Sequence, residues 1–235
     1  MTLRGTEKPI WLTFDCYGTL IQWDEGLQAA VEQILAQQPD AHVEAATLNR
    51  VYDRHEHELQ QTSPHRSFRD VTALSLQRTM SELGLTFRPE DAELLTSRIS
   101  QMPPFPEVVA TLGALKQAGF RLCIISNTDD AIIAGNVEQL GGHIDRVITA
   151  EQAQAYKPSP RIFEHAYRQL GVTIGDVVHI CASPHLDLVA ARGLGFRCIW
   201  IDRGTGRKPL SDYTADATLP RLDKVPPLFA ELGWL

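Results

Sequence analysis

A short apolar run, Ile10-Trp11-Leu12-Thr13-Phe14, passes directly into the polar, glycine-containing segment Asp15-Cys16-Tyr17-Gly18-Thr19. Apolar residues that follow one another without alternation are typical of a strand buried on both faces of a parallel sheet. In an open parallel sheet, ligands bind just beyond the carboxyl ends of the strands. The sequence therefore predicts a buried parallel sheet that contains this strand, with Asp15 at the start of a functional loop.

Strand-like runs of the same kind recur in the second half of the chain, and helix-period segments separate most of them. They lie at residues 121–125, 146–149, 177–181 and 196–201, with a late strand expected at 217–219. Strands that alternate with helices favour a parallel sheet with helices on both faces. The predicted fold class is therefore α/β, with a Rossmann-like core.

Residues 25–101 interrupt this alternation, because they are rich in helix formers and contain no convincing strand. Helices are expected at residues 27–37, 45–61, 68–83 and 89–99. Pro103, Pro104 and Pro106 mark the return to the core, since proline resists helix continuation. We predict a core domain formed by residues 1–24 and 102–235 and an inserted helical cap domain formed by residues 25–101.

The amino-acid composition disfavours several classes of binding partner and of structural bond. The chain has 235 residues and a formal net charge of -7, which disfavours binding to nucleic acid or to an anionic membrane. It shows neither a signal peptide nor an apolar stretch of membrane-spanning length, so a cytoplasmic protein is expected. The 4 cysteines form no C-x-x-C pair, which argues against zinc and against a disulfide framework.

Polar groups follow several of the predicted strands at the same edge of the sheet. Asp15 follows the first strand, Ser126-Asn127 the second, Lys157-Pro158 the third and Asp187 the fourth. Each group alone is more often a turn or capping residue. Together they predict that two carboxylates, a hydroxyl and an ammonium meet in one cleft.

The segment from Phe14 to Leu20, with Ser126-Asn127, Lys157-Pro158 and Asp187, resembles the four motifs of the haloacid dehalogenase superfamily. The resemblance covers nearly the whole chain and includes a helical cap inserted after the first motif. It implies that the first aspartate, here Asp15, is the covalent nucleophile.

Two positions separate the phosphatases of that superfamily from its dehalogenases. The phosphatases carry a second aspartate two residues after the nucleophile, which protonates the leaving alcohol, and an acidic residue that helps to hold magnesium at the start of the fourth motif. Here these positions are Tyr17 and Ala182. A halide leaves without a proton, whereas an alkoxide needs an acid and an attacked phosphate dianion needs a cation. The sequence is thus most similar to the type II, L-2-haloacid dehalogenases.

This resemblance implies a metal-independent hydrolase without an organic cofactor, acting on a short 2-haloacid. Asp15 forms an ester with the halogen-bearing carbon, and Asp187, steered by Lys157, is the expected base for the hydrolytic water. A cap arginine accepts the halide; Arg50 fits best by its position, and Arg54 is the alternative. The residues expected to orient the nucleophile or to contact the substrate are Tyr17, Thr19, Ser126, Asn127, Ser183 and His185. A homodimer through the cap helices is also implied.

Some positions depart from the dehalogenase pattern. Ala182-Ser183-Pro184 stands where Ser-Ser-Asn is expected, and Phe163 stands where a tyrosine is expected. His185 is the candidate substitute for the missing asparagine. Two alternatives stay open: a magnesium-dependent phosphatase of small metabolites, and a non-catalytic binding module that keeps the fold.

A run of histidines and glutamates, from His55 to Glu58, resembles a metal cluster. On a helix, His55 and His57 would point in different directions. We therefore interpret this run as a solvated helix face.

Overall fold

The computed structural model describes residues 7–38 and 42–235. A six-stranded sheet lies at its centre, with the strand order β3-β2-β1-β4-β5-β6 and every neighbouring pair parallel. The strands are β1 (Trp11–Phe14), β2 (Arg121–Ser126), β3 (Arg146–Thr149), β4 (Val177–Cys181), β5 (Arg197–Ile201) and β6 (Ala217–Leu219). Every residue of β1, β4 and β5 is buried, as expected for strands covered on both faces.

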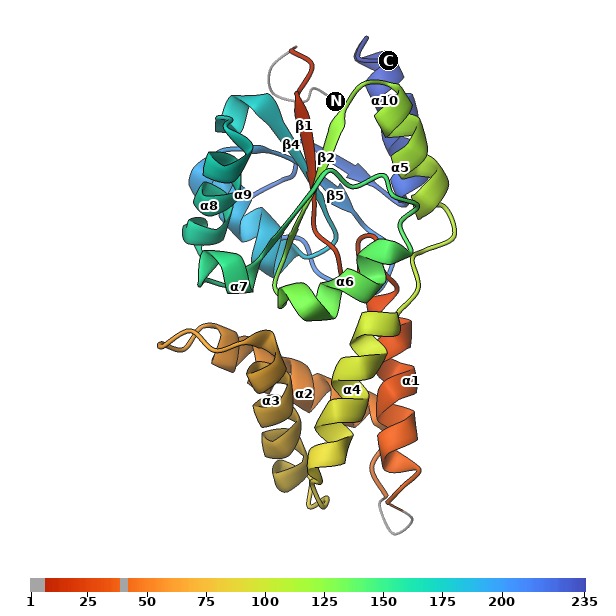
Figure 1. Cartoon of the computed structure of the whole chain (residues 1–235), viewed down its shortest axis with the longest axis vertical. Coiled ribbons are helices and arrows are strands. Elements are labelled where there is room, and N and C mark those ends of the chain that lie inside the picture. The colour runs from red at the N-terminus through yellow and green to blue at the C-terminus, as the bar shows by residue number, and fades with distance from the viewer. Residues whose placement is uncertain (1–6, 39–41) are drawn as a thin grey trace.

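Helices cover both faces of this sheet (Figure 1). On one side lie α5 (Val108–Gln117) and α10 (Val225–Glu231), and on the other α8 (Pro160–Leu170) and α9 (Val189–Leu194). The remaining core helices are α6 (Asp130–Glu138), α7 (Ala150–Ala153) and the short turns η1 (Ile174–Asp176), η2 (Pro184–Leu188) and η3 (Leu222–Lys224). The prediction of an α/β, Rossmann-like core is confirmed.

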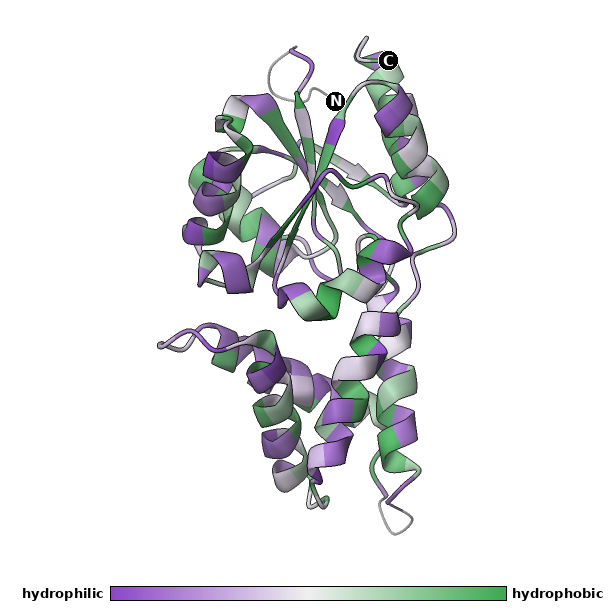
Figure 2. Cartoon of the chain, viewed as in Figure 1, coloured by the Kyte–Doolittle hydropathy of each residue, from purple (hydrophilic) through white to green (hydrophobic). Residues whose placement is uncertain are grey.

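The long insertion after β1 is helical. It contains α1 (Trp23–Leu35), α2 (Ala45–Gln60), α3 (Phe68–Glu82) and α4 (Pro89–Gln101), which gather beyond one end of the sheet in Figure 1. Each helix buries one face: in α1 the buried residues are Leu27, Ala30, Val31 and Ile34, a helical spacing. Figure 2 accordingly shows hydrophilic and hydrophobic residues mixed along these four helices. We call α1–α4 the cap, and the rest of the chain the core.

The sheet changes direction beside β1. The chain runs from β1 to β2 and β3 on one side, then crosses to β4, β5 and β6 on the other. Such a switch point opens a crevice at the carboxyl ends of the two strands, here β1 and β4. Asp15 and Ala182 directly follow these strands. The topology therefore places both ends at the crevice that the cap faces.

None of the helices within the described residues combines the length and the apolar character needed to cross a bilayer.

Candidate active site

Asp15 is held at the end of β1 by three separate contacts. Its N–H donates to the carbonyl of Ile180 at 3.0 Å, which continues the parallel ladder between β1 and β4. Its carboxylate accepts a hydrogen bond from Thr19 Oγ1 at 2.7 Å and one from Lys157 Nζ at 2.7 Å. Thr19 Oγ1 also accepts from the N–H of Ala182 at 2.8 Å, so its own proton is directed at Asp15. The carboxylate is thereby oriented and is only 5% exposed.

Lys157 joins the two carboxylates that the sequence placed at this edge. Its Nζ lies 2.7 Å from Asp15 Oδ1 and 2.8 Å from Asp187 Oδ1, and its side chain is fully buried. Burial alone would lower the pKa of Lys157, yet the Asp15 and Asp187 carboxylates raise it above its ordinary value. Burial alone would likewise raise the pKa of Asp187, but the Lys157 ammonium and the His179 ring hold it below its ordinary value. Lys157 and Asp187 therefore stay ionised around pH 7.

His179 extends this network through β4, although it was not among the expected site residues. Its Nε2 lies 3.0 Å from Asp187 Oδ1 and its Nδ1 lies 2.9 Å from Thr13 Oγ1. Thr13 and His179 are paired in the register of β1 and β4. A neutral ring satisfies both contacts, with Nε2–H donating to Asp187 and Nδ1 accepting from Thr13. A histidine inside an otherwise apolar buried strand was the available signal.

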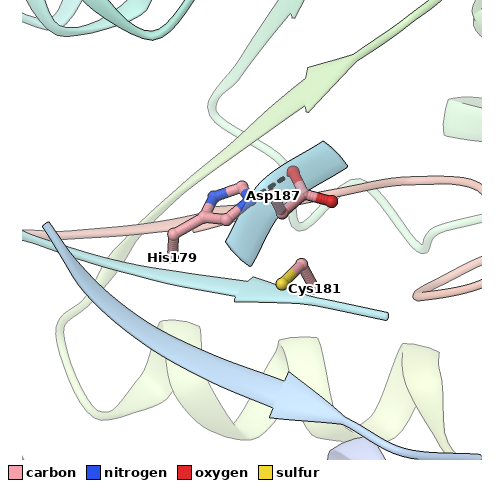
Figure 3. Close-up of side chains that lie close together, drawn as sticks. All are labelled: His179, Cys181 and Asp187. Atoms are coloured by element: carbon pink, nitrogen blue, oxygen red, sulfur yellow. Dashed lines mark hydrogen bonds and ion pairs between the residues drawn. The ribbon is translucent and has the colours of Figure 1, made fainter. Parts of the chain in front are cut away.

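His179, Cys181 and Asp187 also form a group that has the composition of a metal site (Figure 3). Their possible ligand atoms lie within 4.8 Å of one another, and all three residues are buried. In Figure 3 His179 and Asp187 point toward each other, and Cys181 lies to one side. Asp187 Oδ1 already accepts from Lys157 and His179, and burial raises the pKa of the Cys181 thiol well above its ordinary value. A protonated thiol and a carboxylate oxygen engaged by an ammonium do not fit a metal ion.

A cleft of about 620 Å³ lies between the core and the cap, and Asp15 is one of the residues that line it. The other residues that line it are Tyr17, Trp23, Asp24, Asp53, Glu56, His57, Gln60, Phe68, Ser126, Asn127, Ser183, His185, Leu186, Thr205 and Arg207. Ser126 Oγ is buried and has no hydrogen-bond partner among the described residues. An unpaired buried hydroxyl that faces a cleft is available to a ligand.

The cap closes on the core through a few specific hydrogen bonds. Asn127 Nδ2 donates to Gln60 Oε1 at 3.0 Å, and Asn127 Oδ1 accepts from the N–H of Lys157 at 2.7 Å. Asp129 accepts from the N–H groups of Phe68 and Arg69 at 2.7 and 2.9 Å, so a core carboxylate caps the first turn of α3. These contacts fix the cap helices over Asp15.

Helix α2 supplies the cap side of the cleft through Asp53, Glu56, His57 and Gln60, which share one face. Burial and the Asp53 charge raise the pKa of Glu56 to about 8. His57 lies edge-on to His185 of the core, with ring centroids 5.9 Å apart, and burial and His57 lower the pKa of His185. The interpretation of this run as a solvated face is therefore wrong for Glu56, which is half-buried, whereas His57 and Glu58 are exposed. Periodicity showed the face but not what packs over it.

The structure brings most of the expected site residues together. Tyr17, Thr19, Ser126, Asn127, Ser183 and His185 join Asp15, Lys157 and Asp187 in or directly behind the cleft. The Tyr17 hydroxyl donates to Asn136 Oδ1 at 3.0 Å. Burial raises the Tyr17 pKa well above its ordinary value.

The two cap arginines lie elsewhere. Arg50 is exposed and does not line the cleft. Arg54 is paired with Glu82 at 2.6 Å on the outer surface of the cap. The cleft is lined instead by Arg207, a residue that the sequence did not single out.

Comparison with known proteins gives consistent results. A family model described as haloacid dehalogenase-like hydrolase matches residues 11–195. The chain is 31% identical over 165 residues to haloacetate dehalogenase H-2 of Moraxella sp. (strain B), a match that covers 69% of this chain and 73% of that protein. It is 27% identical over 201 residues to an (S)-2-haloacid dehalogenase of Pseudomonas sp. (strain YL), with 82% of each chain covered.

A solved structure agrees in fold. The L-2-haloacid dehalogenase from Xanthobacter autotrophicus, with chloropropionic acid covalently bound, superposes with a TM-score of 0.80. The match covers 94% of this chain and 98% of that chain at 19% identity.

Proposed function

Because the chain belongs to the family of haloacid dehalogenase-like hydrolases, we propose that it hydrolyses the carbon–halogen bond of 2-haloacids at Asp15. The observation that carries the proposal is the pairing of Asp15 with Lys157 at 2.7 Å, beside a Tyr17 whose hydroxyl is bonded to Asn136. This arrangement supplies a nucleophile that is paired with an ammonium, and no carboxylic acid at the position where a phosphatase needs one.

In the first step an Asp15 carboxylate oxygen attacks the carbon that bears the halogen, from the side opposite the halogen. A carbon–oxygen bond forms, the carbon–halogen bond breaks, and the halogen leaves with the bonding electrons as halide. Thr19 and Lys157 hold the carboxylate in one orientation, which reduces the entropic cost of reaching the transition state. The halide needs no proton, so a Tyr17 with a raised pKa is no handicap.

In the second step water attacks the Asp15 carbonyl carbon of the ester. The bond between that carbon and the ester oxygen breaks, so the 2-hydroxy acid leaves with an oxygen that came from Asp15, and the carboxylate is restored with one oxygen from water. The net reaction consumes one haloacid and one water and yields one hydroxy acid, one halide and one proton. Asp187 is the proposed base, because it is ionised and its Oδ2 has no partner among the described residues.

Ser126, Ser183 and His185 are proposed to contact the substrate or the water, since all three line the cleft. Burial and His57 lower the pKa of His185, which favours a neutral ring that can accept a proton. That property supports His185 as the substitute for the asparagine missing from the fourth motif. Phe163, which replaces the expected tyrosine, packs its ring against His179 with centroids 5.4 Å apart.

A reducing compartment suits the cysteines, all 4 of which are free thiols. We therefore propose a cytoplasmic location. The homodimer implied by the resemblance stays a prediction, which light scattering on the purified protein tests.

The test is halide release from a panel of 2-haloacids in the presence of EDTA. A cavity of roughly 150 Å³ holds a six-carbon ring, and the cleft here measures about 620 Å³, so the panel should run from chloroacetate to longer alkyl and phenyl 2-haloacids. Release of halide, with an ester on Asp15 trapped by mass spectrometry, supports the proposal.

Two outcomes would replace the proposal of a dehalogenase. Magnesium-dependent phosphate release that is lost in Asp15→Asn indicates a phosphatase. The absence of any turnover or covalent adduct indicates a binding module.

A further inference from the structure

We propose that Arg207, on the loop between β5 and β6, binds the carboxylate of the substrate in the cleft. The inference rests on the proposed function for the identity of that ligand, a 2-haloacid anion. It assigns the guanidinium that binds the substrate carboxylate to the core, whereas the cap arginine that the resemblance implied, Arg50 or Arg54, was expected to accept the halide.

Arg207 lies where a ligand in the cleft can reach it. Among the described residues that line the cleft, Arg207 is the sole arginine or lysine. Lys157 is fully buried behind Asp15 and already bonded to two carboxylates. Arg50 and Arg54 are both exposed and do not line the cleft. Among the described residues of the lining, an anion that enters the cleft therefore meets one permanently positive side chain, that of Arg207.

The geometry of the guanidinium is the second argument. Asp24 accepts from Nη1 at 2.8 Å and from Nη2 at 2.7 Å, which is an end-on fork, and Thr205 Oγ1 accepts from Nη1 at 2.6 Å. These contacts use three of the five N–H groups of an arginine. The two left over, on Nε and Nη2, point in the same direction along one edge of the plane. Two parallel N–H groups of this kind match the two oxygens of a carboxylate.

The surroundings hold this edge in place. Gly18, three residues after the nucleophile, has φ +81°, and a Cβ built there would lie 3.5 Å from Arg207 Nη2. The guanidinium thus rests on the loop that begins at Asp15. Because Asp24 and Thr205 also fix it, little side-chain entropy is lost when a ligand binds.

Charge balance is the third argument. The lining contains the carboxyl groups of Asp15, Asp24, Asp53 and Glu56. An anionic substrate would be repelled by this set unless a cation faces it. Arg207 offsets the charge of Asp24, with which it is paired, and the pKa of Glu56, raised to about 8 by burial and Asp53, keeps that carboxyl mainly neutral at pH 7. The repulsion that a monoanion meets in the cleft is thereby reduced.

Binding is tested without turnover, in an Asp15→Asn background that cannot form the ester. Isothermal titration calorimetry with 2-chloropropionate compares this parent with the added changes Arg207→Gln, Arg207→Lys, Arg50→Gln and Arg54→Gln. Arg207→Gln should weaken binding by about tenfold to a hundredfold, the usual range for a lost charged hydrogen bond. Arg207→Lys, which keeps the charge but not the fork, should fall between Arg207→Gln and the parent. The two cap variants should stay within about twofold.

Other results would overturn the inference. Binding by Arg207→Gln within twofold of the parent, or an equal loss in Arg50→Gln, would assign the carboxylate to another group. If Arg207→Gln does not fold, as judged by circular dichroism, Arg207→Lys replaces it as the test of the paired N–H groups. Binding by Arg207→Lys within twofold of the parent would then count against the role of Arg207.

The two proposals fail separately. An Arg207-dependent affinity in a protein that releases no halide would overturn the proposed function alone. Halide release with a KM that is insensitive to Arg207→Gln would overturn this inference alone.

Discussion

The two walls of the cleft are built in different ways. The core wall, which contains Asp15 and the residues behind it, is a continuous chain of hydrogen bonds from Thr13 through His179, Asp187 and Lys157 to Asp15. The cap wall, formed by Asp53, Glu56, His57 and Gln60 of α2, contacts the core wall at isolated points such as the Gln60–Asn127 hydrogen bond. The side chains of the core wall are thus fixed by hydrogen bonds to one another, whereas the position of the cap wall depends on a few contacts between the cap and the core.

The difference follows from how each element is fixed. Neighbouring parallel strands share a register, so residues that follow β1 and β4 are forced to the same edge of the sheet. A helix fixes only which of its residues share a face, and where that face lies depends on contacts made far along the chain. The chemistry is therefore expected to depend on the core wall, and selectivity and closure on the cap wall.

The largest expected effect is at the end of the core wall. Asp15→Asn keeps the shape of the side chain and removes the nucleophile, so halide release should fall by at least about a thousandfold. Initial rates measured with an ion-selective electrode give this ratio. Asp212→Asn is the matched control, since Asp212 is an exposed partner of Arg192 far from the chemistry, and it should leave the rate unchanged. Comparable rates in the two variants would remove Asp15 from the mechanism.

A second change tests whether the core wall is held together by its buried ammonium. Lys157→Met leaves Asp15 and Asp187 as neighbouring buried carboxylates without a counter-charge. We expect the free energy of unfolding to fall by about 3–5 kcal/mol in urea titrations. Lys116→Met, which breaks the part-exposed pair with Asp145, should cost at most about 1 kcal/mol. Equal losses would mean that the buried trio adds nothing beyond a surface pair.

The same contrast explains what the sequence could and could not predict. The parallel sheet and the four inserted helices were readable, because apolar runs and helical periodicity are local signals. Asp15 and Lys157 were readable because they directly follow strands. Arg207 was not, because its loop has no motif and its place over Gly18 depends on a long-range contact with Asp24.

Two histidines show the same limit. His179 looked like one more residue of a buried strand, and its role depends on which strand lies beside β4. His57 was placed correctly on a helix face, but the phase of α2 cannot tell whether that face meets water or the core. Both depend on tertiary contacts that periodicity does not encode.

A third prediction concerns the docking of the cap. Asp129→Ala removes the core carboxylate that caps α3 at Phe68 and Arg69, and it should destabilise the protein by about 0.5–2 kcal/mol. It should also raise KM, because the cap wall loses a tether to the core. Ser67→Ala is the control, since Ser67 caps the same helix at Asp70 from within the cap. That variant should lower stability to a similar degree and leave KM unchanged, so equal KM values in the two variants would contradict a docking role for Asp129.

The smallest effect lies on the cap wall, where burial and Asp53 raise the pKa of Glu56 to about 8. Between the ordinary value of 4.5 and about pH 8, the folded protein holds a proton that the unfolded chain has released. The free energy of unfolding must then decrease as the pH rises through this window. Glu56→Gln removes the titration, so its stability relative to the wild type should rise from pH 5 to pH 8.5 by about 1 kcal/mol, a modest value because the side chain is partly exposed. Urea titrations at both pH values measure this difference in the free energy of unfolding, and Glu58→Gln, at an exposed neighbouring position, is the control. If the stability gained by Glu56→Gln is the same at pH 5 and pH 8.5, Glu56 is already ionised in the folded protein.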